Sequence, residues 1–200
     1  MTAVKICGLT RAEDALAAAA FGADFVGFVL WSNSPRATTV EHVRTMVAAL
    51  PATVTPVGVF VDPTVDEVLA AADAGIRVAQ VHSDAPTFLR GVTIPVVRAV
   101  HLAPVGITPE VPDELVLLDA YDPVAKGGTG RTIDWERAAR VAQRRRVILA
   151  GGLTPSNVQQ AIVQVKPYAV DVASGVESSP GIKDHALIQA FITAARSAAA

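Results

Sequence analysis

The chain contains 200 residues, with 17 lysines and arginines against 19 aspartates and glutamates, and a formal net charge of −2. This balance argues against nucleic-acid partners, and no apolar stretch reaches the roughly 20 residues that would cross a membrane. The single cysteine cannot form an internal disulfide, there is no metal-type Cys/His cluster, and the start lacks a secretory signal pattern. We therefore expect a cytoplasmic protein without membrane or nucleic-acid partners.

The hydrophobic fraction of 51% and the mean hydropathy of +0.40 are high for such a protein. Strands that are buried on both faces, as in an all-parallel sheet, account for this excess. The length suits a single domain over residues 1–200 with a well-buried core.

Short runs rich in β-branched residues recur along the chain and predict eight strands. In chain order they are residues 3–7, 24–30, 55–61, 77–81, 94–100, 114–119, 147–150 and 169–172. Alanine-rich stretches between them predict helices, and several of their starts carry capping signals. These signals are Thr10 with Glu13, Thr38 with Glu41, Thr64 with Glu67, Asp134, and Thr154 before Pro155.

Eight strands alternating with helices, at about 25 residues per unit, predict a small (β/α)₈ barrel. An open doubly wound sheet is the alternative, but no Gly-x-Gly-x-x-Gly turn follows the first strand and the spacing stays even to the end. The fifth unit is irregular, because residues 101–113 contain three prolines.

Polar side chains at the carboxyl ends of strands mark the candidate site, since ligands bind at that face of a barrel. Cys7 ends the first strand, and it is either a small buried hydrophobe or a catalytic group. Asp119 follows three apolar residues on the sixth strand, and it is either a general acid or base or a loop cap.

Five further polar residues lie within predicted strands or directly after one. Gln80 and His82 are two apart and point the same way, so they either line the site or form a polar layer inside the barrel. Lys5 and Asp171 lie on strands that become neighbours when the barrel closes. We predict an ion pair between them, with Arg98 nearby and a structural or supporting role.

Glycine-rich turns late in the chain predict a phosphate site, because their backbone N–H groups bind anions. One such turn is the sequence GGTG at 127–130, which includes Gly128. A second turn, with Gly151 and Gly152, follows the seventh strand, and a third, with Ser174 and Gly175, follows the eighth. Arg36, after a serine and a proline, is either solvated or clamps a carboxylate or phosphate with its planar fork.

Taken together, these segments resemble the phosphoribosylanthranilate isomerase family. The matching motifs run in order through almost the whole chain: KICGLT at 5–10, SPR at 34–36, GVFV at 58–61, LLD at 117–119, GGTG at 127–130, AGGLT at 150–154, ASGVE at 173–177 and SPGIKD at 179–184. A small departure is Ser83, which stands where the family commonly has glycine.

The resemblance implies a cofactor-free (β/α)₈ barrel of tryptophan biosynthesis with a reduced fifth helix, acting as a monomer or homodimer on a small phosphorylated substrate. It implies conversion of N-(5-phosphoribosyl)anthranilate to the 1-deoxyribulose phosphate isomer by an Amadori rearrangement. Asp119 would be the general acid and Cys7 the general base. Arg36 would bind the substrate carboxylate, and the glycine-rich turns would bind its phosphate.

Two alternatives stay open. A histidine-pathway or dual-substrate sugar isomerase is related, but it typically has an aspartate where Cys7 stands and two phosphate sites. The residues around Phe60 offer no glycine-rich phosphate turn in the front half of the chain. A non-catalytic barrel that binds a phosphorylated ligand is the other alternative, against which the presence of both Cys7 and Asp119 argues.

Overall fold

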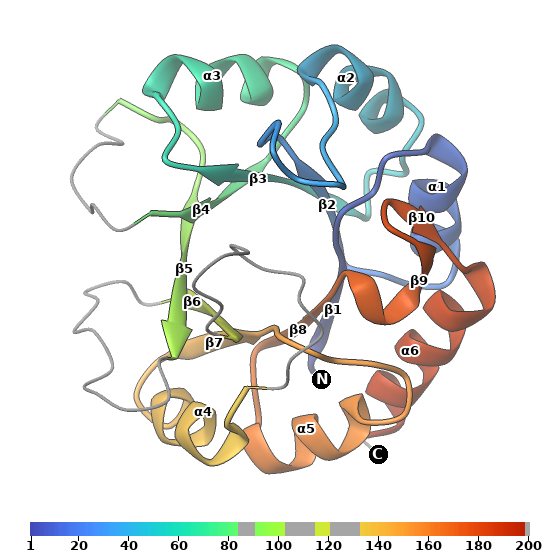
Figure 1. Cartoon of the computed structure of the whole chain (residues 1–200), viewed down its shortest axis with the longest axis vertical. Coiled ribbons are helices and arrows are strands. Elements are labelled where there is room, and N and C mark those ends of the chain that lie inside the picture. The colour runs from blue at the N-terminus through green and yellow to red at the C-terminus, as the bar shows by residue number, and fades with distance from the viewer. Residues whose placement is uncertain (84–90, 103–114, 121–132, 199–200) are drawn as a thin grey trace.

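Eight parallel strands close into a barrel surrounded by helices (Figure 1). The computed structural model describes residues 1–83, 91–102, 115–120 and 133–198. Each strand pairs with its sequence neighbour, and β1 pairs with β8 to close the ring. The strands are β1 (Ala3–Ile6), β2 (Phe25–Val29), β3 (Thr55–Val61), β4 (Val78–His82), β5 (Val96–Leu102), β6 (Leu115–Ala120), β7 (Arg146–Leu149) and β8 (Ala169–Val172).

All eight predicted strands are present, and their ends differ from the prediction by at most two residues. The alternation of side chains along each strand divides the buried residues between two apolar clusters. The larger cluster packs the outer face of the sheet against the helices, while the smaller one fills the inside of the barrel with residues such as Val97, Leu117 and Ile148. The carboxyl-end rim above this inner cluster is left for polar side chains.

Six helices are described around the barrel (Figure 1). They are α1 (Ala12–Ala20), α2 (Val40–Ala48), α3 (Val65–Asp73), α4 (Trp135–Ala142), α5 (Val158–Val165) and α6 (His185–Ser197). A short 3-10 helix, η1 (Ser174–Val176), follows β8 and leads into an antiparallel hairpin of β9 (Glu177–Ser179) and β10 (Ile182–Lys183). The connection from β8 to α6 therefore contains η1 and this hairpin.

The predicted N-caps are confirmed at two helices, α3 and α4. At α3 the capping box is complete, since the Thr64 hydroxyl accepts from the Glu67 N–H and the Glu67 carboxylate accepts from the Thr64 N–H. At α4 the Asp134 carboxylate accepts from the Arg137 N–H, as expected of an N-cap.

The other capping predictions are wrong in detail, at Thr10 because a distant carbonyl takes the hydroxyl and at Thr38 and Thr154 because the helix begins later than predicted. Arg11, not Thr10, precedes α1, and the Thr10 hydroxyl donates instead to the carbonyl of Gly181. At α2 the cap is Thr39, one residue later than predicted. Thr154 begins a turn before α5, whose first residue is Val158.

The predicted ion pair is present inside the barrel. The Lys5 ammonium lies 2.9 Å from the Asp171 carboxylate, and the two side chains are only 2% and 7% exposed. The expectation that Arg98 lies nearby is wrong. Arg98 is in register with Val81 and Val116, which belong to the outer cluster, so its side chain points away from the barrel interior.

Three predictions fall partly or wholly on residues outside the described ranges: the irregular fifth unit, the GGTG turn at 127–130 with Gly128, and the reduced fifth helix. Ser83 is described, and its hydroxyl donates to the Asp62 carboxylate at 2.6 Å. Among the described residues other than glycine, only Asp62 and Lys166 have positive φ, so Ser83 fits its turn without the freedom of glycine.

Candidate active site

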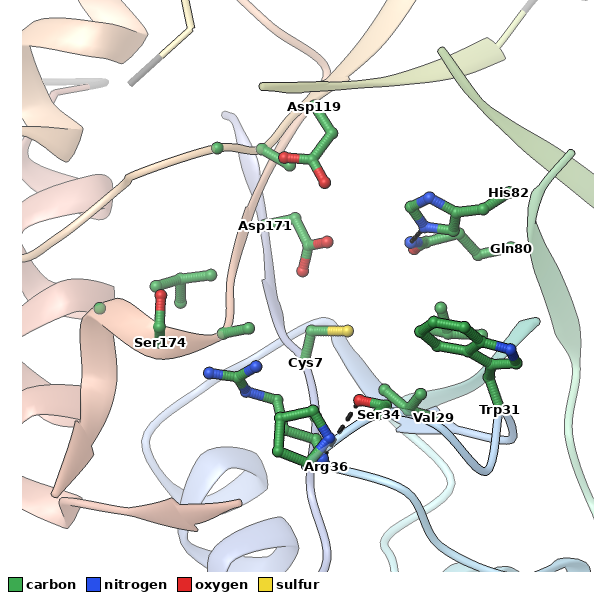
Figure 2. A pocket seen from close by; sticks show the side chains of 18 of the residues that line it. Cys7, Val29, Trp31, Ser34, Arg36, Gln80, His82, Asp119, Asp171 and Ser174 are labelled. Atoms are coloured by element: carbon green, nitrogen blue, oxygen red, sulfur yellow. Dashed lines mark hydrogen bonds between the residues drawn. The ribbon is translucent and has the colours of Figure 1, made fainter. Parts of the chain in front are cut away.

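A pocket of about 380 Å³ opens at the carboxyl ends of the strands. Nine of the ten predicted site residues line it: Cys7, Arg36, Gln80, His82, Asp119, Gly151, Gly152, Ser174 and Gly175. The tenth, Gly128, lies outside the described residues. Figure 2 shows Cys7 and Asp119 on either side of Asp171, with Gln80 and His82 facing them.

Cys7 directly follows β1 and is 7% exposed. Its N–H donates to the carbonyl of Val172 at 2.8 Å, which fixes the residue against β8. Gly27 on β2 leaves the space beside the sulfur open, because a Cβ there would lie 2.7 Å from Sγ. Burial raises the pKa of the Cys7 thiol, while the Lys5 ammonium acts in the opposite direction. The thiol therefore needs a nearby positive charge to ionise.

A chain of hydrogen-bonded polar side chains runs along the pocket from Asp171 through Lys5 and Gln80 to His82, and all of them except Lys5 line it. The Lys5 ammonium donates to Asp171 Oδ2 and to Gln80 Oε1, both at 2.9 Å, and Gln80 Nε2 lies 3.0 Å from His82 Nε2. Burial alone would lower the pKa of Lys5, but the charges of Asp171 and Cys7 raise it above its usual value. These hydrogen bonds thus hold the positive charge of Lys5 close to the Cys7 thiol.

Asp171 also lines the pocket, a position that the sequence reasoning did not assign to it. Its Oδ2 atom accepts from Lys5, whereas its Oδ1 atom is buried and has no hydrogen-bond partner among the described residues. A buried acceptor of this kind is costly unless a ligand or water donates to it. Trp31, two residues beyond β2, was likewise not predicted to line the pocket.

Asp119 lies on β6 and is 6% exposed. Burial raises its pKa to about 6, although the N–H of Ala120 and the charge of His101 act in the opposite direction. The Ala120 N–H donates to Oδ1 at 2.8 Å. Gly151 leaves room for this carboxyl, since a Cβ there would lie 2.8 Å from the Ala120 nitrogen and 3.2 Å from Oδ1. Asp119 is thus a carboxyl group that keeps its proton to a higher pH than usual.

Two turns form the wall of the pocket that faces Gln80 and His82 (Figure 2). Gly151 and Gly152 have φ values of +82° and +64°, which L side chains rarely adopt. Gly175, in η1, packs so closely on the Leu153 carbonyl that no side chain would fit there. The turns after β7 and β8 therefore sit against each other and present backbone groups to the pocket, as an anion site requires.

Arg36 does not stand free in the solvent. Its Nε and Nη2 atoms donate to the two carboxylate oxygens of Glu177, at 2.8 Å and 2.7 Å. The Lys183 ammonium contacts the same carboxylate at 2.8 Å. The sequence contained Glu177 and Lys183 within family-like motifs but gave no signal for their pairing, since Arg36 and Glu177 are 141 positions apart.

Within the described residues, no group of three His, Cys, Asp or Glu side chains is arranged to hold a metal ion. None of the helices in the described ranges has both the length and the apolar character needed to cross a membrane.

A closed (β/α)₈ barrel with a buried carboxyl, a buried thiol and an anion-type turn at one rim defines an acid/base enzyme of small phosphorylated molecules. Residues 4–194 match the family model of N-(5'-phosphoribosyl)anthranilate (PRA) isomerase. The chain belongs to this family.

Known members are similar over their full length. The N-(5'-phosphoribosyl)anthranilate isomerase of Pseudomonas fluorescens (strain Pf0-1) is 46% identical over 199 residues, covering 96% of this chain and 97% of that relative. A phosphoribosyl anthranilate isomerase solved with reduced 1-(o-carboxyphenylamino)-1-deoxyribulose 5-phosphate has a TM-score of 0.83 and 36% identity, covering 98% of this chain and 100% of that one. The structure of monomers generated from the dimeric enzyme of Thermotoga maritima has a TM-score of 0.84 and 36% sequence identity, covering 98% of this chain and 100% of that one.

Proposed function

We propose that the pocket binds N-(5'-phosphoribosyl)anthranilate and isomerises it with Asp119 as general acid and Cys7 as general base. Family membership makes the chain a phosphoribosylanthranilate isomerase of tryptophan biosynthesis. The observation that carries the assignment of roles is that Cys7 and Asp119, 112 positions apart in sequence, line one pocket and are both buried.

The reaction begins with opening of the furanose ring. Asp119 gives its proton to the ring oxygen while the anthranilate nitrogen forms a double bond to C1′, so that the C1′–O bond breaks and a cationic Schiff base results. The pKa of about 6 suits this step, because an ordinary aspartate has a pKa of about 3.9 and holds almost no proton at neutral pH.

The second step needs a base. Cys7 as thiolate removes the proton from C2′, the electron pair moves to the Schiff base, and the resulting enolamine tautomerises to the ketone. The thiol is expected to ionise when the cationic Schiff base arrives beside it, since burial otherwise disfavours the thiolate. The fixed Lys5 ammonium supplies a second nearby positive charge.

The remaining pocket residues suit the two ends of the substrate. In this proposal the turns at 151–152 and 174–175, which line the pocket, bind the phosphate through backbone N–H groups, and Arg36 binds the anthranilate carboxylate. The Trp31 side chain offers an aromatic face for the anthranilate ring. Gln80, His82 and the Oδ1 atom of Asp171 are placed to contact the sugar hydroxyls.

The test is to follow the loss of anthranilate-type fluorescence as purified protein consumes the substrate. Cys7→Ala and Asp119→Asn are each expected to lower kcat by at least about 100-fold, the usual contribution of a positioned acid or base. A near-normal rate in either variant would show that the role given to that residue is wrong.

The histidine-pathway, dual-substrate and non-catalytic alternatives are not favoured, because the matched relatives carry the name of the anthranilate enzyme. Supplying the histidine-pathway substrate is expected to give no turnover. We also propose that the chain is a single barrel domain located in the cytoplasm, without nucleic-acid partners. It acts as a monomer or a homodimer, and light scattering would decide between these two oligomeric states.

A further inference from the structure

A buried ion network lies beside the pocket and has no part in the proton transfers described above. Glu177 is its centre, and its side chain is only 4% exposed. It accepts two hydrogen bonds from Arg36 and one from the Lys183 ammonium, whose side chain is fully buried. Burial alone would raise the pKa of Glu177, but Arg36 and Lys183 hold it below its usual range. The carboxylate is therefore a permanent negative charge between two cations.

The same network reaches the turn after β8. The Lys183 ammonium also donates to the carbonyl of Ala173 at 2.9 Å, directly before Ser174 and Gly175. One short hairpin, β9 with β10, therefore contacts both Arg36, which we propose binds the substrate carboxylate, and the turn that we propose binds its phosphate.

The hairpin is itself firmly held. The Lys183 N–H donates to the Asp14 carboxylate at 3.1 Å, and Asp14 is fully buried on α1. Asp14 also receives two hydrogen bonds from Arg11, at 2.9 Å and 2.7 Å, and lies 2.8 Å from the His185 ring on α6. The hairpin of β9 and β10 is thus fixed to α1 and, through Asp14, to α6.

The Arg36 side chain is fixed on both sides. A Cβ at Gly8 would lie 2.6 Å from Arg36 Cδ, so the aliphatic part of Arg36 packs onto the turn that follows Cys7. The bonds to Glu177 use Nε and Nη2, which set the plane of the guanidinium. A guanidinium has five N–H donors in a planar fork. The edge formed by Nη1 and the second hydrogen of Nη2 is therefore left to bind a carboxylate in a bidentate manner.

We propose that Glu177, together with Lys183, is a positioning residue that fixes the separation between Arg36 and the turn at 174–175. The pocket then selects molecules whose carboxylate and phosphate are that far apart. This inference rests on the proposed function. Holding the fork rigid before binding removes an ordering cost that a free arginine side chain would pay, so it acts on substrate binding rather than on the proton transfers.

The first test is Glu177→Gln, which keeps the shape but removes the charge. We expect KM to rise by about tenfold with kcat changed less than twofold, because the amide has one acceptor oxygen where the carboxylate has two, so that Arg36 loses one of its two hydrogen bonds and the opposite charge. Glu13→Gln is the matched control, since Glu13 pairs with Arg11 at 3.2 Å but is 62% exposed. Its KM is expected to match the wild type.

A double variant separates positioning from general stability. If Glu177 acts through Arg36, then Glu177→Gln adds little to the rise in KM that Arg36→Ala already causes. Effects of the two substitutions on KM that simply add would overturn the proposal, as would a fall in kcat with unchanged KM. Glu177→Asp, which keeps the charge but shortens the side chain, serves if Glu177→Gln does not fold, and its KM is expected to rise as well.

Calorimetry with separate probes tests the two ends and does not depend on turnover. Glu177→Gln is expected to weaken binding of anthranilate, and Lys183→Met to weaken binding of inorganic phosphate, each by about tenfold relative to the wild type. Unchanged binding of both probes would overturn the inference. A wild-type protein that binds both probes but does not turn over the substrate would instead overturn the proposed function and leave the positioning network standing.

Discussion

Replacing Asp119 with asparagine is expected to stabilise the protein while it abolishes the acid step. The pKa of about 6 in the folded chain lies about two above the value of about 3.9 of an unfolded aspartate. Each step of one in pKa corresponds to about 1.4 kcal/mol, so ionised Asp119 costs about 3 kcal/mol of folding free energy at pH 8. Asparagine carries no charge and keeps an oxygen to accept from the Ala120 N–H.

The sign and the pH range follow from linkage. The folded protein binds the Asp119 proton more tightly than the unfolded chain does, so the favourable contribution is fully present below about pH 4 and is lost as the pH rises through 6. The asparagine variant is therefore expected to exceed the wild type in free energy of unfolding by about 3 kcal/mol at pH 8 and by about half of that at pH 5.

Urea denaturation followed by circular dichroism at both pH values measures this difference. Glu41→Gln is the control, because its carboxylate on α2 is 85% exposed, and a change below about 0.5 kcal/mol is expected for it. If Asp119→Asn is no more stable than the wild type at pH 8, or if its advantage does not grow with pH, burial does not hold the proton on Asp119.

Three other predictions concern the thiol and its surroundings. The active form has Asp119 protonated and Cys7 ionised, so kcat/KM is expected to fall tenfold per pH unit below about pH 6, where Asp119 is already protonated and the ionised fraction of Cys7 still falls. Between pH 6 and the raised pKa of Cys7 it is expected to stay level, because each rise in pH removes the acid as fast as it supplies the base. A maximum confined to pH 6 would contradict this. Lys5→Met is expected to lower the free energy of unfolding by about 3–5 kcal/mol, because Asp171 loses its buried partner, and adding Asp171→Asn should recover part of the loss in urea denaturation. The rate of iodoacetamide alkylation against pH should also show a higher Cys7 pKa in Lys5→Met, and an unchanged profile would exclude Lys5 as the charge that acts on the thiol. Gly27→Ala is expected to lower kcat at least tenfold with intact secondary structure, because its Cβ would lie 2.7 Å from Sγ, and normal turnover would show that the sulfur can move aside.

The barrel and most of its rim follow from the sequence because their signals are local. Short β-branched runs predict the eight strands, and the position of Cys7 and Asp119 at the ends of such runs makes both of them candidates for the site, although each also has a structural alternative. The Lys5–Asp171 pair was also predictable, since barrel closure makes the first and last strands neighbours.

Contacts between distant segments are what the sequence did not show. Thr10 has the spacing of a helix cap, but Gly181 competes for its hydroxyl from 171 positions away. By sequence Arg36 is either a solvated loop residue or a clamp for an anion, and only the fold brings Glu177 against it. The Arg98 prediction failed because a position within a strand does not tell which face the side chain takes until the register is known.

The closing pair of strands has a consequence for biosynthesis of the enzyme. Cys7 is synthesised long before β8, yet its N–H bonds to Val172 and the ammonium of Lys5 bonds to Asp171, 166 positions after Lys5. Cys7 therefore cannot take its position in the pocket until β8 has been synthesised, and nascent fragments without β8 should lack turnover. Until then the thiol has none of the burial that protects it in the finished barrel.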